Sequence, residues 1–219
     1  MNVPPDSASG LGLQFFGVMT ASISHELKNV LAIVNENAGL LSDLVLMAEK
    51  GRPLDPARLN AVAAKTRQQV QRADTIIKRL NQFAHSAYDP AALIGLNEVV
   101  ASTIALTARL AAMKNISITA TTAGELKATV DPFQLQNLLW LCLQPMLATA
   151  QGNQTVTLSC EDRGTHAAIV MCLDAGLSAA SVLEAAATGA APLLEALQAT
   201  LTIDSNNAAL VITLPKQRA

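Results

Sequence analysis

The chain has 219 residues, of which 51% are hydrophobic and 3% aromatic, and its formal net charge is −2. This length holds one or two domains with buried cores, and the weakly acidic charge argues against the basic surfaces that bind nucleic acids or anionic membranes. Alanine and leucine dominate the hydrophobic fraction, which favours helix over sheet. No apolar run reaches the ~20 uncharged residues of a membrane span, and the N-terminus lacks the features of a signal peptide. The sequence therefore predicts a cytoplasmic protein without a nucleic-acid or membrane partner.

The first predicted element is a long amphipathic helix from about residue 7 to about residue 50. Its apolar side chains recur at alternating intervals of three and four, as in a coiled-coil helix. This stripe consists of Phe16, Ile23, Leu27, Val30, Val34, Leu41 and Leu44, with Thr20 and Asn37 as small or polar members. The Gly51-Arg52-Pro53 stretch is a helix-stop signal and ends the helix.

A second helix is predicted from Pro56 to about Ser86, with Asp55 as its N-cap. Its stripe consists of Leu59, Ala63, Thr66, Val70, Ala73, Ile77, Leu80 and Ala84. Two long helices joined by a short turn cannot cover both sides of a shared apolar stripe. Two copies of such a hairpin bury it across a two-fold axis, so the sequence predicts a homodimer with a four-helix bundle.

From about residue 91 the pattern changes to alternating helices and short strands. Helices are predicted at 97–113, 132–150 and near 191–200, and strands at 116–119, 126–130, 155–160, 167–173, 201–204 and 208–214, with a turn at 205–207. Helices on one face of a mixed sheet make an α/β sandwich. We therefore predict an α+β protein with a helical hairpin domain at 1–90 and a sandwich domain at 91–219. The three cysteines (Cys142, Cys160 and Cys172) lie in apolar runs without metal-ligand spacing, which predicts buried free thiols, a reducing compartment and no metal site.

One histidine of the first helix stands out by its position. His25 lies two residues from both Ile23 and Leu27, so at ~100° per residue it points away from the apolar stripe. Glu26 stands beside it and Asn29 follows one turn later. An unprotonated imidazole nitrogen is a competent nucleophile toward a phosphoryl group at neutral pH. An ordinary surface histidine is the alternative.

Residues 25–29 read His-Glu-Leu-Lys-Asn, which resembles the phosphoacceptor box of bacterial sensor histidine kinases, H-E-[LIF]-[KR]-[NT]-P. The order of helices and strands is also similar to that family. The resemblance implies that His25 is the phosphoacceptor and that Glu26 orients or deprotonates it. It also implies that Asn29 positions water when a partner's aspartyl phosphate is hydrolysed. Val30 replaces the usual proline, which removes the helix kink.

The boxes that bind nucleotide in that family are incomplete here. Residues 131–139 are similar to the start of its asparagine box, but Pro145 stands where an asparagine ligates magnesium. Asp174 and Gly176 match two positions of the first glycine box, whose second glycine is Ser178. We read these two residues as vestiges and expect no tightly bound cofactor and no metal, since triphosphate binding needs magnesium ligation and close backbone approach together.

The resulting hypothesis is a histidine phosphotransferase of a bacterial two-component phosphorelay. His25 would exchange a phosphoryl group with the aspartates of response-regulator receiver domains, with magnesium on the receiver and without autophosphorylation from ATP. A response-regulator phosphatase, a non-catalytic pseudokinase scaffold and a working kinase stay open as alternatives. The predicted docking residues, outward-facing by heptad phase, are Ser22, Lys28, Ala32, Gln71, Lys78 and Gln82, of which those on the second helix could equally form a solvated face.

Overall fold

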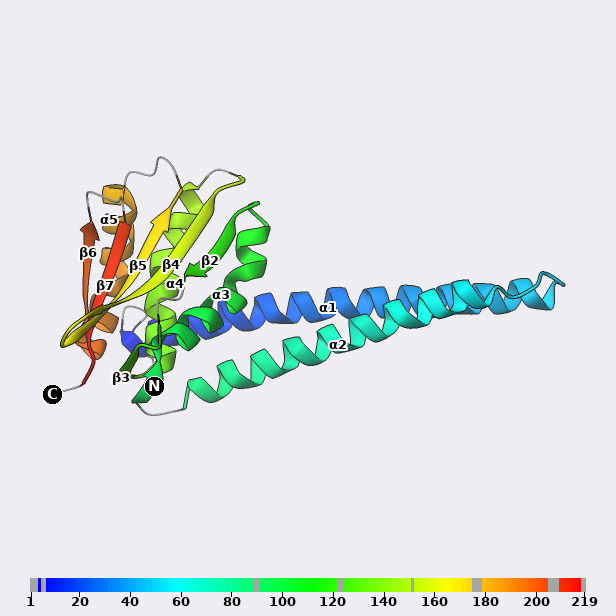
Figure 1. Cartoon of the computed structure of the whole chain (residues 1–219), viewed down its shortest axis with the longest axis horizontal. Helices are drawn as coiled ribbons and strands as arrows, with labels where there is room; N and C mark the ends of the chain where they lie inside the picture. The colour runs from blue at the N-terminus through cyan, green and yellow to red at the C-terminus, as the bar shows by residue number, and fades with distance from the viewer. Residues whose placement is uncertain are drawn as a thin grey trace. The chain divides into compact units, whose positions relative to one another are not determined.

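The chain divides into two compact units in the computed structural model (Figure 1). Residues 20–82 form a helical hairpin unit, and residues 1–19 together with 83–219 form a sheet unit. The division therefore falls at 19/20 and 82/83, and not at the boundary near residue 90 expected from composition. The structure describes residues 4, 7–88, 91–121, 124–150, 152–174, 179–204 and 209–217.

The two long helices have the predicted extents. Helix α1 spans Ala8–Glu49 and helix α2 spans Pro56–Ser86. The Asp55 carboxylate accepts a hydrogen bond from the N–H of Ala57 at 2.9 Å, which confirms its capping role. Gly51 has a φ of 83°, in the left-handed region that favours glycine after a helix.

Within the hairpin unit, only part of each apolar stripe is covered. On α1 the heptad line that is buried consists of Ile23, Val30, Asn37 and Leu44, and the adjacent line of Thr20, Leu27, Val34 and Leu41 is half-buried. On α2 the buried residues include Val62 and Ile76, whereas Val70 and Ile77 are 55% and 43% exposed. The predicted stripe on α2 is confirmed for one of its two heptad lines, which is half-buried and consists of Leu59, Thr66, Ala73 and Leu80. Along the other line, at Ala63, Val70 and Ile77, the preceding residue is the more buried one.

Helix α1 is long and apolar enough to cross a membrane, judged by length and composition alone. Helices that pack in bundles meet the same criterion, so this is weak evidence for a membrane span. The sequence-based expectation that no stretch qualifies is nevertheless not confirmed.

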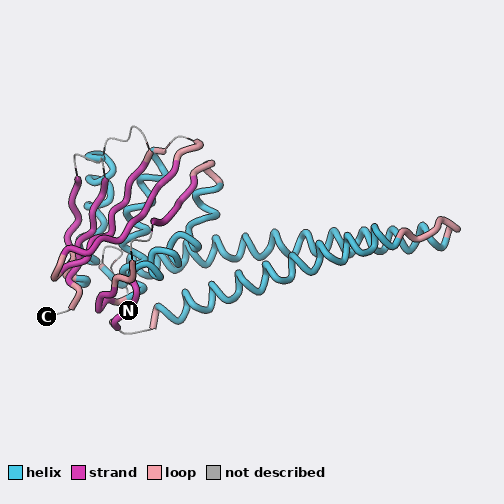
Figure 2. The backbone as a smooth tube through the Cα atoms, in the orientation of Figure 1, coloured by secondary structure: helices cyan, strands magenta, loops and turns pink. Residues whose placement is uncertain are grey.

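The sheet unit holds a five-stranded sheet in the order β2-β4-β5-β7-β6. The strands are β2 (Ser117–Thr121), β4 (Thr155–Arg163), β5 (His166–Leu173), β6 (Thr200–Asp204) and β7 (Ala209–Pro215). Only β2 and β4 pair in parallel; the other neighbours are antiparallel. Helices α3 (Leu96–Ala112), α4 (Pro132–Thr149) and α5 (Ala179–Leu197) cover one face, which gives the predicted α/β sandwich (Figures 1 and 2).

Two elements differ from the sequence prediction. Strand β1 (Ala92–Gly95) was not predicted, because its four residues carry little pattern and form a strand only by pairing with β3 (Lys127–Val130). Helix α5 begins well before residue 191, since its buried side chains continue upstream at helical spacing. These buried residues are Ala186, Ala190, Leu193 and Leu197. The predicted turn at 205–207 lies outside the described residues.

Helix α4 is the central helix of this core. Asp131 caps it by accepting a hydrogen bond from the N–H of Gln134 at 3.0 Å, and Pro132 occupies the first turn. Its fully buried side chains include Leu135, Leu138, Leu139 and Leu143. A helix that is apolar on most of its circumference is typical of a buried layer.

Four phenylalanines join the ends of α1 and α2 to α4 inside the sheet unit. The Phe83 ring meets Phe15 edge-on at 5.4 Å, stacks on Phe16 at 5.3 Å and lies 5.8 Å from Phe133, between ring centroids. Phe83 is 1% exposed. Aromatic pairs at these separations stabilise beyond the area that they bury.

Replacing Phe83 by alanine is expected to lower the free energy of unfolding by about 3–5 kcal/mol, because a ring-sized cavity opens among three aromatic partners. Urea unfolding followed by Trp140 fluorescence measures this loss. Phe83→Leu, which keeps most of the volume, should lose clearly less. A cost below ~1 kcal/mol for the alanine variant would contradict the packing role of this cluster.

Candidate functional site

The side chain of His25 is exposed on α1, in the hairpin unit. In the part of the chain that the structure describes, its ring has no hydrogen-bond partner. Lys28 and Asn29 are exposed three and four residues later, at spacings that place them on the same side of the helix. A small molecule or protein loop can therefore reach the imidazole, an amide and an ammonium group together.

Glu26 takes a different place from the one expected. Its carboxylate lies 3.1 Å from the guanidinium of Arg72 on α2, and the Glu26 side chain is 24% exposed. It is thus held between the two helices, and no hydrogen bond joins it to His25 among the described residues. The Glu26–Arg72 pair fixes the helical turn that carries His25 to the second helix.

Arg72 is a residue that the sequence analysis missed. Counting equally along both helices from the turn does not find this residue, because the count that reaches Glu26 on α1 reaches Arg79 on α2, one heptad beyond Arg72. A carboxylate and a guanidinium at facing levels of a hairpin are natural ion-pair partners.

Five of the six predicted docking residues are exposed, as heptad phase predicted: Lys28, Ala32, Gln71, Lys78 and Gln82. Ser22 is 4% exposed, so its assignment to the outward face is wrong. The buried face of α1 includes Ser22 because it is wider than the predicted stripe and takes in Met19 and Ser22 beside Ile23. The Ser22 hydroxyl has no hydrogen-bond partner in the described part of the chain.

The region similar to a nucleotide site has little polar character. Pro145 lies in α4 beside a cavity of about 320 Å³, whose lining residues are Leu141, Gln144, Pro145, Ala148, Ala186 and Gly189. None of these described residues is charged. Asp174 is exposed at the end of β5, where its N–H donates to the carbonyl of Thr155 at 3.0 Å. Gly176 lies outside the described residues.

The three cysteines are free thiols, as predicted, and Cys142 and Cys160 are buried as predicted, whereas Cys172 is only half-buried. Burial raises the pKa of Cys142 to about 12 and that of Cys160 to about 11. Half-buried Cys172 also has a raised pKa, chiefly through desolvation and further through nearby carboxylates. Because the thiolate is the reactive form of cysteine, a raised pKa lowers the nucleophilic reactivity of these side chains. No cluster of metal-ligating side chains occurs among the described residues.

Comparison with known proteins shows similarity in fold. The catalytic domain of histidine kinase ThkA in one nucleotide-free form is 14% identical over 60% of this chain and 100% of its own, with a TM-score of 0.52. Another nucleotide-free form of the same domain gives a TM-score of 0.51 at 14% identity, covering 59% of this chain and 100% of its own. No protein-family profile and no curated protein matches the sequence. The sheet unit therefore has the fold of histidine kinase catalytic domains. At 14% sequence identity, the similarity shows the fold and not the activity.

Proposed function

We propose that this protein is a histidine phosphotransferase of a two-component phosphorelay, in which His25 exchanges a phosphoryl group with receiver-domain aspartates. The observation that carries the proposal is the exposed imidazole of His25, which has no hydrogen-bond partner among the described residues, within a His-Glu-Leu-Lys-Asn box on a long helix. The fold of the sheet unit, which is that of a histidine kinase catalytic domain, agrees with descent from a kinase.

The chemistry needs few groups from this chain. The unprotonated nitrogen of His25 attacks the phosphorus of an aspartyl phosphate, a P–N bond forms, and the P–O bond to the aspartate breaks and leaves its carboxylate. Phosphoryl transfer depends mainly on positioning and charge neutralisation, and the receiver supplies the magnesium ion. Lys28, three residues from His25, offsets phosphate charge. The reverse reaction uses the same groups.

Arg72 acts in this scheme as a positioning residue for Glu26. We expect Arg72→Ala to lower the rate of phosphoryl transfer about tenfold, because the helical turn that carries His25 loses its ion-pair link to α2. Stability should fall by no more than ~1 kcal/mol, since the pair is partly exposed. Rapid-quench kinetics with a phosphorylated receiver measures the rate.

Arg79→Ala is the matched control for Arg72→Ala. Arg79 lies one heptad further along α2, is exposed, and has no ion pair among the described residues. Its replacement should leave the rate unchanged. Equal rates for the Arg72 variant and the wild type would remove Arg72 from the mechanism.

ATP-driven autophosphorylation is not part of the proposal. The position that corresponds to a magnesium-ligating asparagine is Pro145, which has no side-chain oxygen to offer. The cavity beside it has no charged lining residue in the described part of the chain. We regard Asp174 and Gly176 as remnants of a nucleotide site, and expect neither a resident cofactor nor a metal.

A second candidate function is hydrolysis of a receiver's aspartyl phosphate. It is favoured by Asn29, whose exposed amide lies one turn after His25 and can orient water. In that case His25 need not carry phosphate. A non-catalytic scaffold and a working kinase are further outcomes of the tests.

We also propose that the protein is a cytoplasmic homodimer. The exposed Val70 and Ile77 and the half-buried Leu27, Val34 and Leu41 leave apolar surface on both helices of the hairpin. A second hairpin buries such surface in a four-helix bundle. The receiver would dock beside His25, on Lys28 and Ala32 of α1 and on Gln71, Lys78 and Gln82 of α2.

The proposal is tested by incubating the protein with a receiver domain phosphorylated by a small-molecule donor. We expect a phosphohistidine, detected by its ³¹P signal and mapped to His25 by mass spectrometry. Loss of receiver phosphate without any phosphohistidine would favour the phosphatase. No change in receiver phosphate, with a verified cognate receiver, would favour the scaffold.

A further inference from the structure

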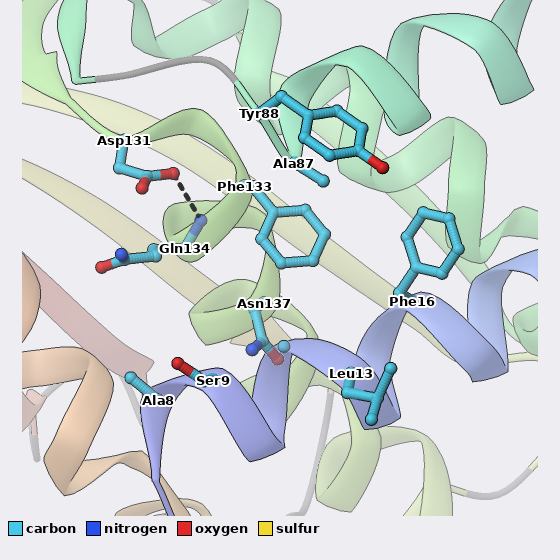
Figure 3. A pocket seen from close by; sticks show the side chains of 11 residues that line it. Ala8, Ser9, Leu13, Phe16, Ala87, Tyr88, Asp131, Phe133, Gln134 and Asn137 are labelled. Carbon is cyan, nitrogen blue, oxygen red and sulfur yellow. Dashed lines mark hydrogen bonds between the residues drawn. The ribbon is translucent and has the colours of Figure 1, made fainter. Parts of the chain in front are cut away.

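A cavity of about 480 Å³ lies in the sheet unit between the first turns of α1, the end of α2 and the start of α4 (Figure 3). Its described lining residues are Ala8, Ser9, Gly12, Leu13, Phe16, Ala87, Tyr88, Asp131, Phe133, Gln134 and Asn137. The volume is in the ordinary range for sites that hold small molecules. It shares no lining residue with the cavity at Pro145, which lies further along α4.

The floor of this cavity contains an unsatisfied amide. Asn137 is 1% exposed, and neither its side-chain oxygen nor its side-chain nitrogen has a hydrogen-bond partner in the described part of the chain. Burying an amide without partners is costly, so such groups in folded proteins are normally paired. Figure 3 shows the Asn137 side chain between α4 and α1, below the Phe133 ring. The carboxamide presents one donor and one acceptor side by side.

The walls of the cavity are aromatic. The rings of Phe16, Phe133 and Tyr88 surround the opening, and the Tyr88 side chain is largely exposed (Figure 3). Gly12 allows α1 to approach this wall closely, because a Cβ at that position would lie 3.1 Å from Cε1 of Phe133. Planar heterocycles such as nucleobases stack on aromatic side chains of this kind, because every base has a π-face.

The charge of the lining selects against anions. Asp131 is the only charged residue among the described lining residues, and its carboxylate accepts a hydrogen bond from the N–H of Gln134. No lysine or arginine is present there to pair with a phosphate or carboxylate of a ligand. The lining therefore disfavours a negatively charged ligand.

From these features we infer that the cavity binds an uncharged planar nitrogen heterocycle whose edge carries an adjacent hydrogen-bond donor and acceptor, as a purine base or nucleoside does. The asparagine carboxamide pairs with such an edge through two hydrogen bonds, as it does with the N6 and N7 atoms of adenine. The rings of Phe16 and Phe133 stack on the heterocycle. This site is independent of phosphoryl transfer at His25.

The test is titration of the full chain with adenine, followed by calorimetry and by saturation-transfer NMR. We expect a Kd below about 1 mM for a ligand of this size. Purine, which lacks the exocyclic amino group, should bind about tenfold more weakly. AMP should bind more weakly than adenosine, because its phosphate meets Asp131 without a compensating cation.

Three variants assign the binding to this cavity. Asn137→Leu should weaken adenine binding by about fivefold or more, since both hydrogen bonds are lost. Gly12→Ala should weaken it by narrowing the space beside Phe133. Gly17→Ala is the matched control on the same helix, because a Cβ there meets nothing within 4 Å, and it should bind as the wild type does. Circular dichroism confirms that each variant is folded.

Failure to bind adenine below about 1 mM would overturn the assignment. So would adenine binding that survives both Asn137→Leu and Gly12→Ala, since the ligand would then occupy another place. Tighter binding of AMP than of adenosine would contradict the argument from charge.

Discussion

His25→Gln is expected to abolish the appearance of phosphohistidine, a fall of at least ~10³-fold to the background of the assay, because an amide cannot serve as the phosphoryl acceptor. The change occurs on an exposed surface, so the free energy of unfolding should stay within ~0.5 kcal/mol of the wild type. Phosphoryl transfer from a labelled receiver, followed by gel electrophoresis under basic conditions, measures the effect.

The other two histidines supply the control. His85 and His166 are also exposed, so His85→Gln and His166→Gln make the same chemical change at equally accessible sites. Both should transfer at the wild-type rate. If His25→Gln still removes phosphate from the receiver while Asn29→Ala does not, the protein acts as a phosphatase through Asn29. Persistent phosphohistidine in the His25 variant would place the acceptor elsewhere.

The double variant Val70→Glu/Ile77→Glu is expected to convert the protein from a dimer to a monomer. These two apolar side chains are the exposed heptad line of α2, and a bundle interface would bury them. Two carboxylates placed in such an interface lose their hydration without gaining partners, which costs several kcal/mol. Light scattering should give about twice the chain mass of 22.9 kDa for the wild type and the chain mass for the variant.

Gln68→Glu/Thr75→Glu tests whether charge alone is responsible. These two residues are exposed, have the same heptad spacing and lie on another side of α2. The control adds the same charge and should remain dimeric. A monomeric wild type, or a dimeric Val70→Glu/Ile77→Glu variant, would contradict the four-helix bundle.

The ends of the two long helices that meet at the hairpin turn were predictable because local signals set them. Asp55 and Pro56 begin α2 at the expected residue, and Gly51 ends the first helix through its left-handed conformation. Such signals act over a few residues and do not depend on the rest of the fold. The strands β4 and β5 follow from alternation in the same way.

It was less predictable which side of each hairpin helix is buried. A bundle helix carries two adjacent heptad lines of apolar residues, and the sequence does not distinguish the line that packs within the hairpin from the other line. Ser22 was placed outside and is buried, whereas Val70 was placed on the contact stripe and is exposed. Which half of the stripe meets the chain's own second helix depends on the register and rotation of the pair, which no local pattern encodes.

Side-chain contacts between distant segments of the chain could not be predicted from the sequence either. Arg72 meets Glu26 across the hairpin, and the Asn137 side chain, which has no hydrogen-bond partner in the described part of the chain, lies below Phe133 between α1 and α4. Neither residue belongs to a local motif that announces its role. By contrast, His25 was identifiable from its neighbours and from its phase on the helix alone.

The most direct test of the central claim compares two phosphoryl donors in one experiment. The purified protein is incubated with radiolabelled ATP and magnesium alone, and in parallel with a receiver domain that carries the label on its aspartate. The account predicts acid-labile, base-stable label on His25 from the phosphorylated receiver and none from ATP. Label from ATP alone would contradict it and establish a kinase, despite Pro145 and the uncharged cavity beside it.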